Sequence, residues 1–421
     1  MSGLFDGLRT GAWVTRERMR FVALAVLTAF TIGFCYVIAT AHDGIDFQGR
    51  PIGTDFSNVY AAGSYALEGH AEAAFDPALQ HAREQAIFGT ETPAYGWHYP
   101  PFFLFIAAVL ALMPYGLALA VWQGATLVPY LLSIRAILVA FAPGSRDGGQ
   151  SLAGPLWLLL AIGFPAVFVN FGHGHNGFLT AALMAAALLA LRGRPVLAGV
   201  LFGLLAYKPQ FGLMIPLVLA ATGQWRAVAA AAATVALLAV ATTLALGPHV
   251  WDAFLASTRF TRIIVLEAGD TGWYKIQSVF SWTRMWGGSI PLAYAMQGTV
   301  TAALGVALVW LWRGAASFPL KAAALCIAAI LATPYSLDYD MMVLAPAIAF
   351  VAADGFARGF HNWDKSALAG LWLVPLVTRS VAEWTLIPLG VPMMIAMFLL
   401  VLRRAAATSA VPTPSLSSQT P

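Results

Sequence analysis

Apolar segments long enough to cross a lipid bilayer recur along almost the whole of this chain. Hydrophobic residues make up 60% of the sequence and charged residues only 10%. A chain of this kind cannot bury its apolar surface in a soluble globule, so it must be solvated by lipid. We therefore predict an all-α polytopic membrane protein with about 12 transmembrane helices. The apolar segments are 21–41, 100–113, 115–140, 151–171, 175–191, 195–207, 209–222, 226–247, 289–312, 318–333, 339–353, 366–378 and 384–402.

The basic residues between these segments predict the orientation of the chain, because short cytoplasmic loops are enriched in lysine and arginine. Arg16, Arg18 and Arg20 precede the first apolar segment, which predicts that residues 1–20 are cytoplasmic. The next polar segment, 42–98, then lies on the extracytoplasmic side. Its excess of acidic over basic residues fits that side of the membrane.

Alternating the later segments across the bilayer defines the rest of the domain organisation. The membrane domain covers 21–402 and has a second outer loop at 248–288. One net crossing must contain both apolar segments of 100–140, so we expect 100–113 to lie along or dip into the outer leaflet without spanning it, against protein or a cavity. The Ser-, Thr- and Pro-rich residues 403–421 are expected to form a disordered cytoplasmic tail.

Asp55 is the ionisable residue that this organisation singles out, because it follows the first span on the predicted outer side. Ionisable groups beside a membrane face are candidates for function. Tyr60 and Gly63 follow at helical spacing and place Asp55 at or before a helix start. The carboxylate could serve as a general base, kept charged by the helix N-terminus, or could simply cap that helix.

Four residues are candidates for substrate contacts. Three lie together in one turn, and the fourth is a tyrosine directly before the apolar segment 100–113. Tyr99 lies in Trp-His-Tyr-Pro-Pro, which could offer a flat surface to a sugar or prenyl group, or belong to an interfacial aromatic belt. His173, His175 and Asn176 lie in a glycine-rich turn. No third ligand of clear spacing follows, so hydrogen bonding to a substrate or to neighbouring helix ends is favoured over metal binding, and no cofactor is indicated.

Basic residues on the same predicted side are candidates for binding a phosphate. Lys208 and Gln210 interrupt two apolar segments, where the lysine could neutralise a phosphate or extend towards lipid headgroups. The 248–288 loop suits an anionic lipid headgroup, or its cations could only meet bilayer phosphates. Its candidate residues are Arg259, Arg262 and Lys275.

The last polar turn before the C-terminal segments contains Tyr335, Asp338 and Asp340. These acids could hold a sugar hydroxyl, or they could pair with the nearby cations. The sequence leaves both possibilities open.

Taken together, these motifs resemble bacterial glycosyltransferase family 87, over about residues 21–402. The matching motifs are Asp55…Tyr60…Gly63, Phe75-Asp76-Pro77, Tyr99-Pro100-Pro101, Gly174-His175-Asn176-Gly177, Lys208-Pro209-Gln210 and Pro334-Tyr335…Asp338-Tyr339-Asp340. The family includes mannosyltransferases that use polyprenyl-phosphate-mannose in phosphatidylinositol mannoside synthesis.

The resemblance implies a GT-C fold in a bacterial inner membrane, with the active site on the periplasmic side. It implies inverting transfer of a hexose from a polyprenyl-phosphate donor to a lipid or glycan acceptor, with Asp55 in the place of the base. His175 stands where relatives have glutamine, so its contact departs from the pattern. Membrane lipids are expected partners, whereas nucleic acid is not, because the chain has no dense basic face.

Two other functions are compatible with this composition. A lipid or sugar flippase would need charges along a path through the bilayer, whereas here they cluster at one predicted face. A non-catalytic subunit of an envelope complex would use Asp55 only as a helix cap. Both make predictions that differ from those of an enzyme.

Overall fold

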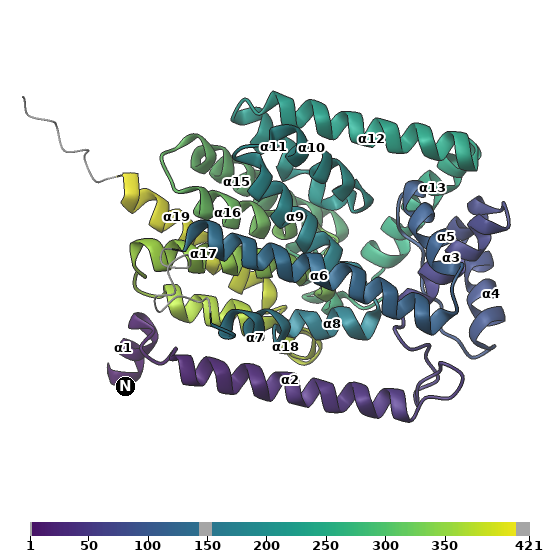
Figure 1. The fold of residues 1–421 in the computed structure, drawn as a ribbon, viewed down its shortest axis with the longest axis horizontal. Coiled ribbons are helices and arrows are strands. Elements are labelled where there is room, and N and C mark those ends of the chain that lie inside the picture. The colour runs from purple at the N-terminus through teal and green to yellow at the C-terminus, as the bar shows by residue number, and fades with distance from the viewer. Residues whose placement is uncertain (1, 143–153, 410–421) are drawn as a thin grey trace, which may run out of the picture.

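The computed structural model describes residues 2–142 and 154–409, and these are helical apart from loops and isolated β-bridges (Figure 1). The α-helices are α1 (Ser2–Thr10), α2 (Arg16–Ala39), α3 (Phe56–Leu67), α4 (Pro77–Phe88), α5 (Leu104–Ala111), α6 (Tyr115–Phe141), α7 (Leu156–Ile162), α8 (Pro165–His173), α9 (Gly177–Leu191), α10 (Pro195–Leu204), α11 (Met214–Ala221), α12 (Trp225–Leu246), α13 (His249–Phe260), α14 (Val279–Met285), α15 (Ile290–Arg313), α16 (Phe318–Leu331), α17 (Leu344–Arg358), α18 (Asp364–Thr385) and α19 (Gly390–Ser409). Shorter 3-10 or π-helical turns are η1 (Ala71–Phe75), η2 (Pro101–Phe103), η3 (Leu205–Tyr207), η4 (Pro209–Gly212), η5 (Thr261–Glu267), η6 (Trp273–Lys275) and η7 (Asp338–Val343).

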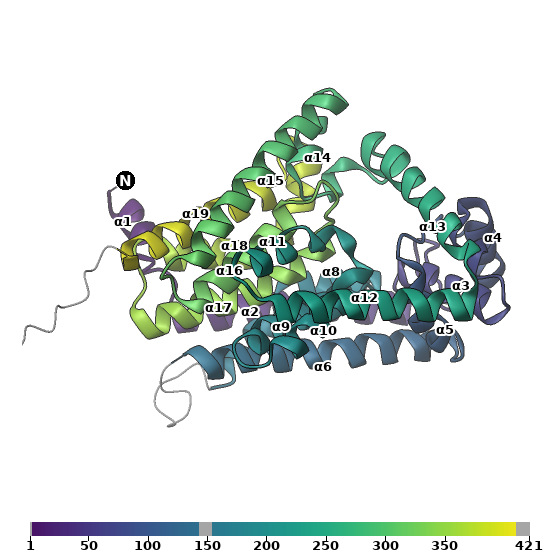
Figure 2. The same ribbon diagram turned by 90° about the horizontal axis from the view of Figure 1, so that it is seen from above.

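The helices form an elongated body whose two ends are built differently. α3, α4, α5 and α13 lie at one end, whereas α1, the start of α2 and the end of α19 lie at the other (Figures 1 and 2). α2 and α12 run along opposite flanks in Figure 1, and only 11% of the most apolar stretch of each is buried. Apolar helices exposed in this way are typical of surfaces that face lipid.

Six helices in the described residues are long and apolar enough to cross a membrane, or seven if the bent pair α7–α8 is one span. The chain is therefore a multi-pass membrane protein, but the dozen spans that we expected are not shown. Prolines and glycines divide several apolar segments into short helices: α9, α10 and α11 contain 15, 10 and 8 residues. At about 1.5 Å per residue none of these crosses the roughly 30 Å hydrocarbon core alone. Residues 151–153 of one predicted segment lie outside the described residues.

The core of the bundle surrounds α16, whose side chains are almost all buried. Alanines supply much of its surface, and small residues let neighbouring helices in a membrane approach closely. Residues 42–113, here named the Asp55 unit, have a separate apolar cluster in which α3 packs on α5. α5 has eight residues and is too short to span, in line with the expectation for 100–113.

Gly63 allows the closest approach within the Asp55 unit. A Cβ at this position would lie 2.1 Å from the carbonyl oxygen of Ala107 on α5. We expect Gly63→Ala to destabilise the protein by about 1–3 kcal/mol, because overpacking forces the two helices apart. Thermal unfolding in detergent measures this, with Gly124→Ala as the control, since a Cβ there would meet nothing within 4 Å. Equal unfolding temperatures for the two variants would contradict the prediction.

The C-terminal helix corrects the expected start of the disordered tail. α19 continues to Ser409, so the prediction of disorder is wrong for residues 403–409. Arg404 is buried and pairs with Asp354 of α17 and Asp364 of α18. Leaving such a buried charge unpaired costs about 3–5 kcal/mol, so the pairs hold this turn in the bundle. Residues 410–421 lie outside the described residues.

Candidate functional site

Asp55 lies directly before α3 at its N-cap position, but its side chain makes no capping hydrogen bond. The helix-cap interpretation is therefore not supported. Instead, Oδ1 of Asp55 lies 3.6 Å from Nδ1 of His173, and the side chains are 24% and 26% exposed. The carboxylate is thus held by a partner and can still be reached from outside the fold.

Gly174 lets residues 172–177, here named the histidine turn, pack against residues 53–56, here named the Asp55 loop. Gly174 ends α8 in the left-handed conformation, with φ of 58°. A Cβ there would lie 2.6 Å from Cβ of Phe56 and 3.0 Å from the oxygen of Gly53, so a larger residue would push the turn away. Oγ1 of Thr54 lies 2.9 Å from the same ring nitrogen of His173. His173 therefore contacts the Asp55 loop directly.

The other predicted residues of this turn lie deeper. Nε2 of His175 is 2.9 Å from the hydroxyl of Tyr99, and its ring stacks on Tyr339 at 3.5 Å between centroids. Asn176 is buried, and its Oδ1 has no hydrogen-bond partner among the described residues. In the described part of the chain no three histidine, cysteine or acidic side chains gather in a metal-binding arrangement.

Lys208 does not face an open phosphate site, contrary to one expectation from the sequence. Its ammonium pairs with Asp340, and both side chains are buried. The second oxygen of Asp340 accepts a hydrogen bond from the backbone N–H of Leu337 at 3.0 Å. The alternative that the acids pair with cations is the one the structure shows. Removing Lys208 would leave a buried carboxylate without its cation and would act first on stability.

Arg379, a cation that escaped the sequence analysis, lies beside Asp338. Arg379 on α18 reaches Oδ2 of Asp338 at 3.5 Å and lies 5.8 Å from the ring centre of Tyr274. Burial lowers the pKa of Lys275, and the charge of Arg379 lowers it further, while the charges of Asp338 and Asp55 oppose this. Lys275, Arg379, Asp338 and Asp55 thus share one electrostatic neighbourhood. The sequence signal for Arg379 was an arginine directly after an apolar segment, on the predicted outer side.

The arginines of α13 and η5 are placed differently from Lys275. Arg259 and Arg262 are exposed, and Arg262 lies 3.7 Å from Glu267 of the same π-helical turn. No ion pair links either arginine to the Asp55 site among the described residues. The structure does not bring them to this site.

The remaining predicted residues have mainly packing roles. Tyr60 donates a hydrogen bond to the carbonyl oxygen of Met113 at 2.9 Å, which ties α3 to the start of α6. Tyr335 and Trp273 both pack against a small apolar cluster. Gln210 is half-buried in η4, between the Lys208 turn and α11.

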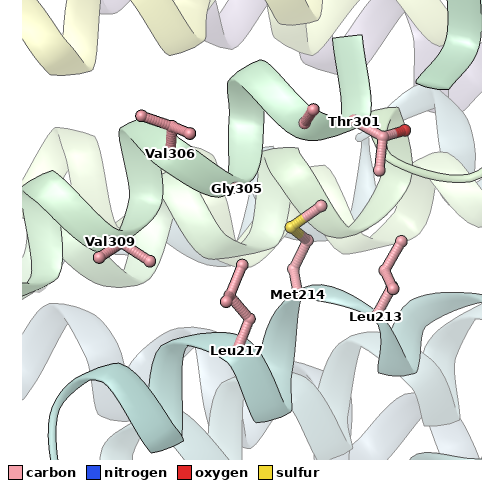
Figure 3. A pocket seen from close by; sticks show the side chains of 8 residues that line it. Leu213, Met214, Leu217, Thr301, Gly305, Val306 and Val309 are labelled. Carbon is pink, nitrogen blue, oxygen red and sulfur yellow. The ribbon is translucent and has the colours of Figure 1, made fainter. Parts of the chain in front are cut away.

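An apolar groove lies between α11 and α15 (Figure 3). Its volume is about 510 Å³, and it begins at Leu213, five residues beyond Lys208. A Cβ at Gly305 would approach Leu217 to 3.2 Å, so the missing side chain helps to keep the groove open. The lining residues are Leu213, Met214, Leu217, Thr301, Ala302, Gly305, Val306 and Val309.

Glu84 on α4 is another buried carboxyl that interacts electrostatically with Asp55, and sequence reasoning missed it. Its Oε2 accepts a hydrogen bond from the backbone N–H of Tyr95 at 2.9 Å, while Oε1 has no partner among the described residues. Burial raises the pKa of Glu84 to about 8, and the charge of Asp55 raises it as well. Glu84 is therefore protonated at neutral pH.

This raised pKa makes stability depend on pH. Between about pH 4.5 and pH 8 the folded state keeps a proton that the unfolded state has lost, so stability falls as pH rises through this range. We expect Glu84→Gln to abolish this dependence and to exceed the wild type in stability by a few kcal/mol near pH 8.5. Unfolding temperatures in detergent between pH 5.5 and 8.5 measure the effect. Parallel curves for the two proteins would contradict it.

Comparison with known proteins adds one finding to this geometry. The sequence model of glycosyltransferase family 87 matches residues 97–334. The chain belongs to glycosyltransferase family 87. No curated protein and no solved structure matches it. The matched residues include the histidine turn and Lys275, whereas Asp55, Asp338 and Arg379 lie outside them.

Family membership confirms the expected class of activity. A family 87 protein is a membrane glycosyltransferase with the GT-C fold, which acts on a sugar donor and an acceptor. Membership in an enzyme family favours catalysis over the flippase and the assembly subunit.

Proposed function

We propose that this glycosyltransferase transfers a hexose, with mannose as the leading candidate, from a polyprenyl-phosphate donor to a lipid or glycan acceptor. The reaction would take place on the periplasmic side of a bacterial inner membrane. The observation that carries the proposal is the Asp55 carboxylate, which is partly exposed, makes no capping bond and lies in the same electrostatic neighbourhood as Lys275 and Arg379.

The proposed reaction is a single displacement at the anomeric carbon of the sugar. The acceptor oxygen forms a bond to this carbon while the bond to the phosphate oxygen breaks, and polyprenyl phosphate leaves with the electron pair. Asp55 takes the proton of the acceptor hydroxyl, and a positioned base of this kind contributes about 10²–10⁴ in rate. Attack from the face opposite the leaving group inverts the configuration.

His173 positions the base in this scheme. Its Nδ1 lies within reach of Asp55 and Thr54, on a turn that Gly174 holds against the Asp55 loop. A carboxylate that His173 already holds in place loses less conformational freedom when the acceptor binds. His173, which the sequence suggested as a substrate contact, thus acts through Asp55.

Lys275 and Arg379 would bind the donor phosphate. The two positive charges lie close enough that Arg379 lowers the pKa of Lys275. A bound anion would relieve the repulsion between them. Among the described residues Lys275 has no ion pair, and Arg379 has one, at 3.5 Å to Asp338. Cations in this position stabilise the charge that develops on the departing phosphate, so no acid has to protonate it.

The groove between α11 and α15 would hold part of the prenyl chain. It is lined almost wholly by apolar side chains. A lipid-linked donor needs an apolar path of this kind for its prenyl chain. Burial of isoprenoid carbons would contribute about 25 cal/mol per Å² of apolar surface.

Reconstitution tests the proposal directly. Proteoliposomes are supplied with polyprenyl-phospho-[¹⁴C]mannose and a bacterial envelope lipid extract as acceptor. We expect a labelled glycolipid whose new anomeric configuration is opposite to that of the donor, together with free polyprenyl phosphate. Movement of labelled donor between leaflets without product would support a flippase instead. A labelled product with retained configuration would contradict the single displacement.

A further inference from the structure

The short helix α1 presents an apolar face that the enzyme site does not use. With about 100° between successive residues of a helix, Leu4, Phe5 and Leu8 fall on one face, while Asp6 and Thr10 fall on the other. Leu4 and Phe5 are 75% and 57% exposed. We propose that α1 lies flat in the bilayer interface of the leaflet where α2 begins, with this face among anionic phospholipids.

The rest of the protein holds α1 in a fixed place. The backbone N–H of Trp363 donates to the oxygen of Arg9 at 2.6 Å, and Oγ of Ser366 donates to the oxygen of Leu8 at 2.6 Å. The indole of Trp13 donates to the same Ser366 hydroxyl at 2.8 Å. These bonds anchor the C-terminal end of α1 to the start of α18, so its exposed face points in a defined direction.

The apolar face continues an exposed apolar surface at the start of α2. α2 begins six residues after α1 ends, and its first turns expose Phe21 and Leu24. Figure 1 shows α1 at this end of α2, turned away from its direction. A helix that crosses α2 at its membrane entry lies where the interface between headgroups and acyl chains would be.

Charge favours an anionic lipid surface as the occupant. Residues 1–20 contain four arginines against one aspartate and one glutamate, a net charge of +2. Basic residues beside an apolar helix face are attracted to anionic headgroups. An open notch of about 440 Å³ beside this face is lined by Gly3, Leu4, Gly7, Leu8 and Trp13.

Spin labels can locate α1 in the full-length protein. Labels are placed singly by Leu4→Cys, Phe5→Cys, Asp6→Cys or Thr10→Cys in a Cys35→Ser background, because Cys35 is exposed whereas Cys326 is buried. The proteins are reconstituted in phosphatidylglycerol–phosphatidylethanolamine vesicles. We expect labels at 4 and 5 to be relaxed by oxygen and protected from an aqueous nickel complex, and labels at 6 and 10 to be relaxed by nickel.

Two outcomes would overturn the inference. Equal relaxation by nickel at positions 5 and 6 would show that the face meets water. Protection of positions 4 and 5 from both reagents would show that protein, either a second copy or another partner, covers it. Neither outcome depends on sugar transfer, so the inference can fail while the proposed function stands.

Discussion

Asp55→Asn is expected to lower sugar transfer by a factor of about 10²–10⁴ while the protein still folds. Asparagine has the same shape but cannot take up the proton of the acceptor hydroxyl. Its effect on folding should be small, because the Asp55 side chain makes no capping hydrogen bond and is 24% exposed. Initial rates with labelled donor in proteoliposomes measure the loss, and unfolding temperature measures the fold.

Asp76→Asn is the matched control in the same part of the molecule. Asp76 caps α4 by accepting hydrogen bonds from the backbone N–H groups of Ala78 and Leu79, and asparagine caps helices about as well. We expect this variant to keep its transfer rate and its stability. An Asp55→Asn protein that transfers sugar at the native rate would remove the base from the mechanism.

Arg379→Ala is expected to weaken use of the donor by a factor of about 10–100, seen in kcat/KM for the donor at saturating acceptor. Hydrogen bonds to charged groups contribute about 1.5–3 kcal/mol each, which corresponds to this range. Arg379→Lys should retain part of the donor use that Arg379→Ala loses, because lysine supplies the charge without the planar fork of donors. Rates at a series of donor concentrations in proteoliposomes measure both variants.

Arg262→Ala serves as the control for loss of a positive charge. Arg262 is 58% exposed, and its one ion pair among the described residues is a long contact with Glu267. We expect less than a twofold change in donor use, since exposed pairs contribute about 0–1 kcal/mol. If Arg262→Ala impaired donor use as strongly as Arg379→Ala, the phosphate would be bound along η5 and not beside Asp338.

Part of the candidate site could be predicted from the sequence, because it depends on which side of the membrane each loop faces and on the order of the loops along the chain. Apolar segments predict which loops share a face of the membrane, and on that basis Asp55, the histidine turn and Lys275 were expected on one side. The pairing of Lys208 with Asp340 could not be chosen in advance, because a cation beside a membrane break can meet lipid, substrate or protein. Only the folded geometry shows its partner.

Arg379 shows a further limit of the sequence pattern. It follows an apolar segment, where arginines commonly meet headgroups, and nothing in its neighbours marks a site. The fold of α18 brings it to Asp338, 41 residues away in the chain. In the same way, Arg404 belongs to the bundle and not to a tail, because Asp354 and Asp364 reach it from two other helices.

The sequence by itself determined that this protein is a helical membrane protein, because a chain with so few charges has no alternative to lipid as its solvent. It also determined the family, through motifs whose order survives without any contact information. The tertiary structure decided how the apolar segments break into short helices and which cations pair with buried acidic side chains. Those outcomes depend on contacts between residues far apart in the chain, and a pattern along one dimension does not contain them.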